Sequence, residues 1–350
     1  MNRGVPYALL AAATFGASTP FSKLLVGQVA PVTLAGLLYL GSGLGLLAWF
    51  LLRLAYFRSA GDANSNLRLH DLPWLAGAIL FGGIAGPVLL MVGLIATPAS
   101  SASLLLNMEG VLTSLLAWFV FKENFDRRIF LGMLLIVAGG VVLGWERRPE
   151  LGIPWGAVAI VGACLCWAID NNLTRKVSAS DAVQIAGVKG LVAGTVNLSI
   201  ALAIGSPMPH LDIALRAGIV GFCGYGLSLV LFVLALRNLG TARTGAYFSI
   251  APFVGAAISL ALLGETPGGG FWLAGALMGA GILLHLAENH RHLHRHVLMS
   301  HAHEHTHDDH HQHHHDFPFE EGKSHTHAHS HDAMEHSHTH VPDIHHRHQH

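Results

Sequence analysis

Charged side chains are scarce in this sequence: Asp, Glu, Lys and Arg make up 12% of its 350 residues, and they stand in short clusters. The long stretches between the clusters consist mainly of Leu, Ala, Val, Gly and Ile. An apolar stretch of about 20 residues matches the hydrocarbon thickness of a bilayer. A soluble fold could not bury ten of them, so we expect an all-α polytopic membrane protein with the lipid bilayer as its surroundings. The ten stretches are 6–27, 31–53, 73–95, 99–121, 129–145, 154–174, 183–204, 214–236, 242–263 and 270–288.

Other sequence features are few or missing, and each gap excludes a class of function. The three cysteines all fall inside apolar stretches, where we expect them to pack as small apolar side chains. No P-loop motif is present, so ATP is not the expected driver of any transport. Nothing indicates covalent catalysis or a basic, aromatic-rich surface for nucleic acid. We therefore expect neither an enzyme nor a nucleic-acid-binding protein.

Lysine and arginine are distributed unevenly between the predicted loops, and this bias indicates the orientation in the membrane. If the N-terminus lies in the cytoplasm, the outer loops hold Arg147, Arg148 and Arg216. The inner segments then hold Arg3, Arg53, Arg58, Arg68, Lys122, Arg127, Arg128, Arg175, Lys176, Arg237 and Arg243. An even number of helices returns the C-terminus to the same side. We therefore predict a multi-pass protein of the inner or plasma membrane with both termini in the cytoplasm.

The two halves of the apolar region repeat each other. The stretch from Phe15-Gly16 to Lys23 aligns with Trp167-Ala168 to Arg175 at an offset of 152 residues. Later, Gly110, Glu123 and Ala138-Gly139 align with Pro252, Glu265 and Ala280-Gly281 at an offset of 142. Five helices per half is an odd number, so the second copy should be inverted in the membrane, as in many secondary transporters. The predicted units are a first five-helix repeat, 1–148, a second, 153–288, and a tail, 289–350.

These motifs resemble those of the drug/metabolite transporter superfamily, EamA-like branch. The resemblance rests on Phe15-Gly-x-x-x-Pro20-x-x-Lys23, on its echo from Trp167 to Arg175, and on the helix-end glutamates Glu123 and Glu265. The whole chain also resembles the His-tailed nickel/cobalt efflux members of this superfamily. The resemblance implies a proton-driven or exchange-driven carrier, often an exporter, with a central cavity lined by both halves.

Two positions depart from the family pattern. The second helix usually carries an Arg, whereas this chain reads Leu37-Leu38-Tyr39. The fourth usually has a mid-helix Pro, whereas Asn107-Met108-Glu109-Gly110 stands in that place. A substrate is therefore not transferred from the family to this chain.

A few polar side chains lie at membrane depth, where insertion of an ionisable residue costs about 2.5–3.5 kcal/mol and indicates function. The candidate transport site consists of Glu109 and Asn107 in the fourth stretch, Asp170, Asn171 and Asn172 in the sixth, and the bases Lys23 and Lys189. A central carboxylate in a low-dielectric cavity should favour its protonated form and could exchange that proton for a cation. Alternatively, the two acids and two bases pair with each other and only fix the helix packing.

Histidine is concentrated in the last 61 residues: 24 of the 27 lie between His290 and His350. Neutral imidazole is a good ligand for nickel, cobalt and zinc, so we expect the tail to bind these ions without requiring them as cofactors. Beyond residue 297 the polar, low-complexity sequence predicts disorder without metal. If the tenth helix continues, His290/His294 and His292/His296 share a helical face, with His285 just above. The other candidate ligands are His301, His303, His305, His307, His325, His327, His329 and His331.

Three functions remain open at this point. The first is a divalent-metal exporter that exchanges nickel, cobalt or zinc for protons, with the tail collecting or sensing metal. The second is an exporter of an amino acid or other small metabolite with a metal-sensing tail. The third is a membrane-anchored metal store. Apart from the transported solute and the bilayer, a second copy of the chain could be a partner, as a homodimer.

Overall fold

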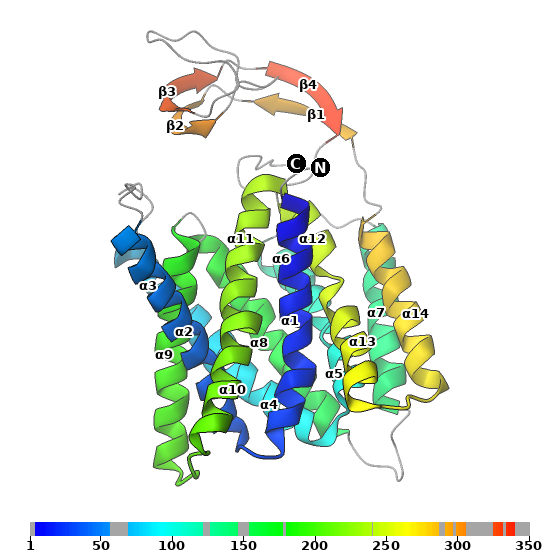
Figure 1. The fold of residues 1–350 in the computed structure, drawn as a ribbon. Coiled ribbons are helices and arrows are strands. Elements are labelled where there is room, and N and C mark those ends of the chain that lie inside the picture. The colour runs from blue at the N-terminus through cyan, green and yellow to red at the C-terminus, as the bar shows by residue number, and fades with distance from the viewer. Residues whose placement is uncertain are drawn as a thin grey trace. The chain divides into compact units, whose positions relative to one another are not determined.

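The computed structural model describes residues 4–56, 69–121, 127–145, 154–177, 180–239 and 241–286, and four short segments of the tail. The chain divides into two compact units, Met1–Glu288 and Asn289–His350. The first unit is built from helices, which run roughly side by side in Figure 1.

Within the described residues, each of the ten apolar stretches coincides with one helix or with two or three consecutive helical segments. Among the residues that the structure describes, six helical stretches, including the third and eighth, are long and apolar enough to cross a membrane, and three more apolar helices are shorter. The uninterrupted helices are α1 (Gly4–Val26), α2 (Pro31–Tyr56), α7 (Arg127–Trp145), α8 (Trp155–Val177), α9 (Ala182–Ala203) and α14 (Gly269–Leu286). A short 3-10 turn, η2 (Leu69–Asp71), precedes α3.

The remaining stretches are irregular, and the irregularities occur in pairs. The third contains a π-helical segment, η3 (Ile79–Ala85), between α3 (Leu72–Ala78) and α4 (Gly86–Ala96). The eighth contains η4 (Phe222–Leu227), between α10 (Leu211–Gly221) and α11 (Ser228–Leu239). The fourth is broken between α5 (Ala99–Leu105) and α6 (Met108–Phe121), and the ninth between α12 (Thr241–Phe248) and α13 (Ala251–Leu263).

Each irregularity in the first half recurs in the second within one residue of the 142-residue offset found in the sequence. The two halves therefore share the positions of their helix irregularities as well as the apolar pattern of their sequences. Discontinuous helices in inverted repeats surround the substrate sites of many secondary transporters. π-Helical segments are also frequent at functional sites.

Two of the three prolines Pro20, Pro87 and Pro252, which lie within the predicted spans, coincide with these irregularities. Pro87 stands in the first turn of α4, directly after η3, and Pro252 stands in the first turn of α13, directly after the break. A proline lacks the N–H that continues a helix, but it fits the first turn, where that N–H has no helical partner. Pro20, by contrast, lies inside the uninterrupted helix α1.

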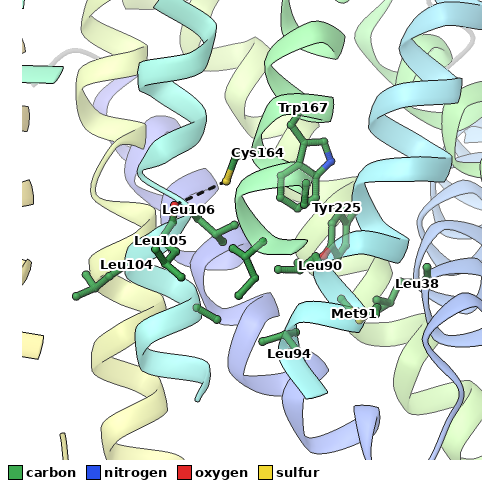
Figure 2. Close-up of a cluster of buried hydrophobic side chains, with 14 of the residues drawn as sticks. Leu38, Leu90, Met91, Leu94, Leu104, Leu105, Leu106, Cys164, Trp167 and Tyr225 are labelled. Carbon is green, nitrogen blue, oxygen red and sulfur yellow. Dashed lines mark hydrogen bonds between the residues drawn. The ribbon is translucent and has the colours of Figure 1, made fainter. Parts of the chain in front are cut away.

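The helices pack closely where small residues meet. A Cβ added to Gly16 would collide with the backbone carbonyl of Ala251 on α13, so the glycine of the first-helix motif permits the α1–α13 approach. Large apolar side chains fill the interior between the irregular helices, and Figure 2 shows Leu38, Leu90 and Met91 in this cluster. Cys164 is buried there and donates to the Leu105 carbonyl at 3.7 Å. All three cysteines are free thiols, as expected for packing residues.

Lys23 lies near the C-terminal end of α1 and contacts the end of α4. Its Nζ donates to the carbonyl oxygen of Thr97 at 2.9 Å and to that of Leu94. The last carbonyls of a helix have no helical partner, and a positive charge there complements the helix dipole. Lys23 therefore caps α4, and these contacts do not link it to Glu109 or Asp170.

Replacing Lys23 by methionine should lower the stability of the bundle while leaving the cargo preference unchanged. The side chain keeps its length and loses its charge, so the α4 carbonyls lose charged hydrogen bonds worth about 1.5–3 kcal/mol each. The measurement is the thermal midpoint of the purified protein in detergent, with Lys23→Arg as the charge-retaining control. A variant with changed cargo preference at unchanged stability would instead assign Lys23 to transport.

The tail unit contains short antiparallel strands, which differ from the predicted absence of regular structure. β1 (Arg291–His296) pairs with β4 (Met334–Thr339), and β2 (Met299–His305) pairs with β3 (His325–His331). The physical reason is that histidines alternate with small or polar residues, and this two-residue period is that of a strand.

The helical histidine pairs at the junction, His290/His294 and His292/His296, require that the tenth helix continues, and in the described residues that condition is not met. Helix α14 ends at Leu286, and residues 291–296 form β1, so His292, His294 and His296 lie on a strand and not on a helical face. His294 is in register with His336 of β4. The physical reason is again the alternation: a strand spaces residues i and i+4 about 13 Å apart, whereas a helix brings them together on one face.

His290 and His307 lie outside the described residues. For His285 and for the predicted ligands on the strands, the structure describes the backbone and not the side chain. The metal-binding role of the tail histidines therefore stays a prediction from the sequence.

Candidate functional site

The break between α5 and α6 places Glu109 in the first turn of α6. A carboxylate is favourable there because the first N–H groups of a helix carry partial positive charge. Its Oε1 accepts a hydrogen bond from Nδ2 of Asn171 on α8, at 2.8 Å. Glu109 is half-buried and Asn171 is exposed, so the pair is not enclosed by the described side chains. The structure therefore brings together two of the predicted site residues from opposite halves of the chain.

Asp170, the neighbour of Asn171 on α8, forms a buried ion pair with Lys189 of α9. Its Oδ2 contacts the Lys189 ammonium, and its Oδ1 accepts from the Thr174 hydroxyl at 2.9 Å. The alternative that acids and bases neutralise each other thus holds for Lys189. For Glu109 no ion pair is found among the residues whose side chains are described.

The π-helical segment η3 supplies backbone carbonyls to the same region. The carbonyl oxygen of Gly82 accepts from the Tyr39 hydroxyl at 2.6 Å and from Nε1 of Trp167 at 3.0 Å. The neighbouring carbonyl of Gly83 accepts from Nδ2 of Asn197 at 3.0 Å. A π segment lacks part of the regular helical bonding, which leaves such carbonyls for side chains.

These contributors were not among the predicted site residues. The sequence carried one usable signal for them: Trp167 begins the second copy of the repeated motif, three residues before Asp170. Tyr39 stands in the Leu37-Leu38-Tyr39 stretch where the chain departs from the family pattern. Gly82 and Thr174 carry no comparable signal, because their roles depend on the π segment and on the ion pair.

The first residues of the two motif copies meet between the halves. Phe15 and Trp167 pack edge to face, with ring centroids 6.3 Å apart. Phe15 also lies 6.1 Å from the Tyr225 ring, and Tyr225 lies 5.3 Å from the Tyr39 ring. Figure 2 shows Trp167 and Tyr225 above Leu90 in the buried cluster. Aromatic side chains of both halves therefore meet at the interface between the repeats, and inverted-repeat carriers in general bind their substrates at such an interface.

The other predicted amides make local contacts. Asn107, in the break itself, donates to the Leu104 carbonyl at 2.9 Å and lies 3.7 Å from the Met278 sulfur. Asn172 is buried and donates to the Ala168 carbonyl one turn earlier, at 2.8 Å. These contacts support the helix break and the packing of α8. They do not connect either amide to Glu109.

A cavity of about 260 Å³ lies at the N-terminal end of the fourth stretch, next to Glu265. The two carboxylate oxygens of Glu265 accept from the backbone N–H groups of Ala99 and Ser100, at 2.8 and 3.0 Å. Glu265 thereby caps the start of α5 and ties the second half to the first. Because its oxygens are engaged in this cap, we do not place the transport site in this cavity.

The chemistry available around Glu109 is that of a few oxygen ligands. Within the described residues, no group of three or more His, Cys, Asp and Glu side chains is close enough to hold a metal ion. Helices α6 and α8 bring the Glu109 carboxyl and the Asn171 amide into contact, whereas Asp170, the residue before Asn171, bonds to Thr174 and Lys189. Carboxylate and amide oxygens can bind a divalent cation reversibly, in contrast to a closed cage of soft ligands.

The sequence matches proteins that are known as transporters. It is 29% identical to an uncharacterized transporter of Methanothermobacter thermautotrophicus, over 72% of this chain and 76% of that protein. It is 25% identical to the uncharacterized transporter YyaM of Bacillus subtilis, over 75% and 86% of the two chains. The uncharacterized inner membrane transporter YedA of Escherichia coli is also 25% identical, over 74% and 82%.

A solved crystal structure has the same fold. It superposes with a TM-score of 0.59, at 20% identity, over 80% of this chain and 95% of the other. The family model of the EamA-like transporters matches twice, over residues 2–145 and 154–287. Two consecutive matches correspond to the two halves that repeat each other in sequence and in backbone distortions. This chain is therefore a multi-pass membrane protein that belongs to the EamA-like transporter family of the drug/metabolite transporter superfamily.

Proposed function

We propose that this transporter exports divalent transition-metal cations, namely nickel, cobalt or zinc, in exchange for protons. The observation that carries the proposal is the Glu109–Asn171 pair, a carboxylate and an amide at a helix break in the middle of a span. A carboxyl group in a low-dielectric surrounding favours its protonated form, and an arriving cation replaces that proton. When protons return, the cation is released.

The tail supports a metal as the cargo. Its histidines are ligands suited to these ions, and a tether keeps them at high effective concentration near the mouth of the carrier. For this role the tail has to lie in the cytoplasm, as the distribution of Lys and Arg predicts for ten crossings. The tail then collects or senses ions, and the bundle moves them.

An exporter of an amino acid or another small metabolite is the second candidate. It is favoured by the Lys189–Asp170 pair, because a cationic group next to a carboxylate could bind a solute that carries both charges. The third candidate, a metal store without transport, does not account for polar groups at membrane depth in a transporter fold.

The test is flux into inside-out vesicles that contain the full-length protein. Nickel, cobalt and zinc should each be offered with a proton gradient of either direction, and a panel of amino acids should serve as the competing cargo. We expect metal uptake that is driven by a gradient acid inside and is accompanied by proton release. Uptake of an organic solute without metal-driven proton flux would support the second candidate and contradict the first.

A truncation after Arg291 tests the tail in the same vesicles. We expect its uptake rate to fall at low metal concentration and to approach that of the intact protein at saturation, because the tail raises the local metal concentration. Tail-dependent metal tolerance that survives fusion to an unrelated membrane anchor, with no flux, would support a store.

A further inference from the structure

In the Asp170–Lys189 ion pair, the lysine ammonium neutralises a buried carboxylate. The two side chains are 8% and 10% exposed. One Asp170 oxygen contacts the ammonium, and the other accepts from the Thr174 hydroxyl. A carboxylate at this depth without a cation is strongly unfavourable. Asp170 therefore needs a positive charge beside it in every state of the carrier in which it is ionised.

The repeat shows that helix packing at this position does not require the pair. At the 152-residue offset, Asp170 and Lys189 correspond to Ser18 and Leu37 in the first half, and both of these are uncharged. The neighbouring contact is the same in both halves: a Cβ on Gly82 would strike Asp170, and a Cβ on Gly224 would lie 2.5 Å from the Ser18 Cβ. The two repeats thus share this backbone arrangement, but only the second repeat carries charged side chains there.

The pair also lies beside the position proposed for the cargo. Asn171 follows Asp170 on α8 and donates to Glu109. Asp170 and Lys189 therefore place one negative and one positive charge next to the Glu109–Asn171 pair. A cation bound at Glu109 therefore meets attraction from Asp170 and repulsion from the Lys189 ammonium.

We propose that Lys189 is a tethered counter-cation: its ammonium neutralises Asp170 while the carrier is empty, and the transported cation takes its place when the carrier is loaded. This inference rests on the proposed function, because it requires a cationic cargo. The tethered charge lets the empty carrier reorient without a buried, unpaired carboxylate. Exchange of one bound cation for another never passes through the empty state, so exchange does not need Lys189.

The test compares net flux with exchange for Lys189→Gln in proteoliposomes of the full-length protein. Net nickel uptake into nickel-free vesicles should fall by at least about tenfold, because the return of the empty carrier exposes the cost of an unpaired Asp170. Exchange of radiolabelled for unlabelled nickel should stay within about threefold of the unmodified protein, since the loaded carrier compensates Asp170 with cargo. Lys189→Arg, which keeps the charge, should retain both activities.

A second pair of measurements covers the case in which Lys189→Gln does not fold. The double variant Asp170→Asn, Lys189→Gln removes both charges; it should fold and lose net uptake and exchange together. In the unmodified protein, nickel should raise the labelling of Lys189 by an amine reagent, followed residue by residue by mass spectrometry. Labelling of Lys23, which caps α4, should not change.

The possible outcomes separate the two proposals. A folded Lys189→Gln protein that loses net uptake and exchange in parallel, or nickel that leaves Lys189 labelling unchanged, overturns the counter-cation role alone. An unmodified protein that carries none of nickel, cobalt and zinc refutes the proposed cargo and this inference with it.

Discussion

Replacing Glu109 by glutamine should reduce the flux of nickel, cobalt and zinc by roughly 10- to 100-fold, because an interaction with a charged group contributes about 1.5–3 kcal/mol. Glutamine has nearly the same size, and its side-chain oxygen can still accept from Asn171, whose bond to Glu109 is 2.8 Å long. The fold should therefore survive while the negative charge that stabilises the cation is lost. Flux into inside-out vesicles and the metal tolerance of expressing cells are the measurements.

Glu265→Gln is the matched control for this variant. It makes the same chemical change in a carboxylate that caps α5 at Ala99 and Ser100. We expect a lower thermal midpoint, by the equivalent of about 0.5–2 kcal/mol, and unchanged cargo preference. A folded Glu109→Gln protein that transports metal like the unmodified one would remove Glu109 from the mechanism.

Replacing Gly82 by alanine should disturb the Asp170–Lys189 ion pair from the π segment η3. The added Cβ would fall well within van der Waals distance of the Asp170 carboxylate, so the ion pair or the π segment has to shift. Such overpacking typically costs about 1–3 kcal/mol. We expect a lower thermal midpoint in detergent together with loss of flux.

Gly110→Ala is the control at similar depth, since nothing lies within 4 Å of a Cβ at that position. It should keep stability and flux. Adding Asp170→Ser and Lys189→Leu to Gly82→Ala copies the Ser18 and Leu37 of the first half and shortens the obstructing side chain. This triple variant should recover part of the stability and none of the flux. A Gly82→Ala protein as stable and active as the unmodified one would contradict the geometry of the site.

The apolar stretches and the repeat were predictable from the sequence because both depend on patterns longer than one helix turn. The helical elements coincide with the predicted stretches, and the two family matches fall on the two halves. The ionisable residues were also recognisable, since a charge in an apolar run is costly wherever it ends up. The partners of those charges were not predictable, because they depend on how the helices cross.

Lys23 and Lys189 show that the sequence does not reveal the partner of a charged residue. Both are single lysines in apolar stretches, yet Lys23 caps the carbonyls of α4 and Lys189 pairs with Asp170. No proline in the sequence indicates the helix break beside Glu109. Asn107 supports this break through a hydrogen bond to the Leu104 carbonyl. The four-residue spacing of the junction histidines, His294 among them, fits one helical face only if the tenth helix continues, and the same residues also alternate as in a strand.

The paired π segments and helix breaks have a consequence for how direction is set. The two halves share the positions of their irregularities, so each half can adopt the conformation of the other. The inward-facing and outward-facing states are then related by the pseudo-two-fold axis between the repeats. The charged groups break that equivalence, because Asp170 and Lys189 occur in one half only. The two halves therefore share a backbone but not a charge pattern, so the inward-facing and outward-facing states are not equivalent in energy, while the gradients of the solutes set the net direction.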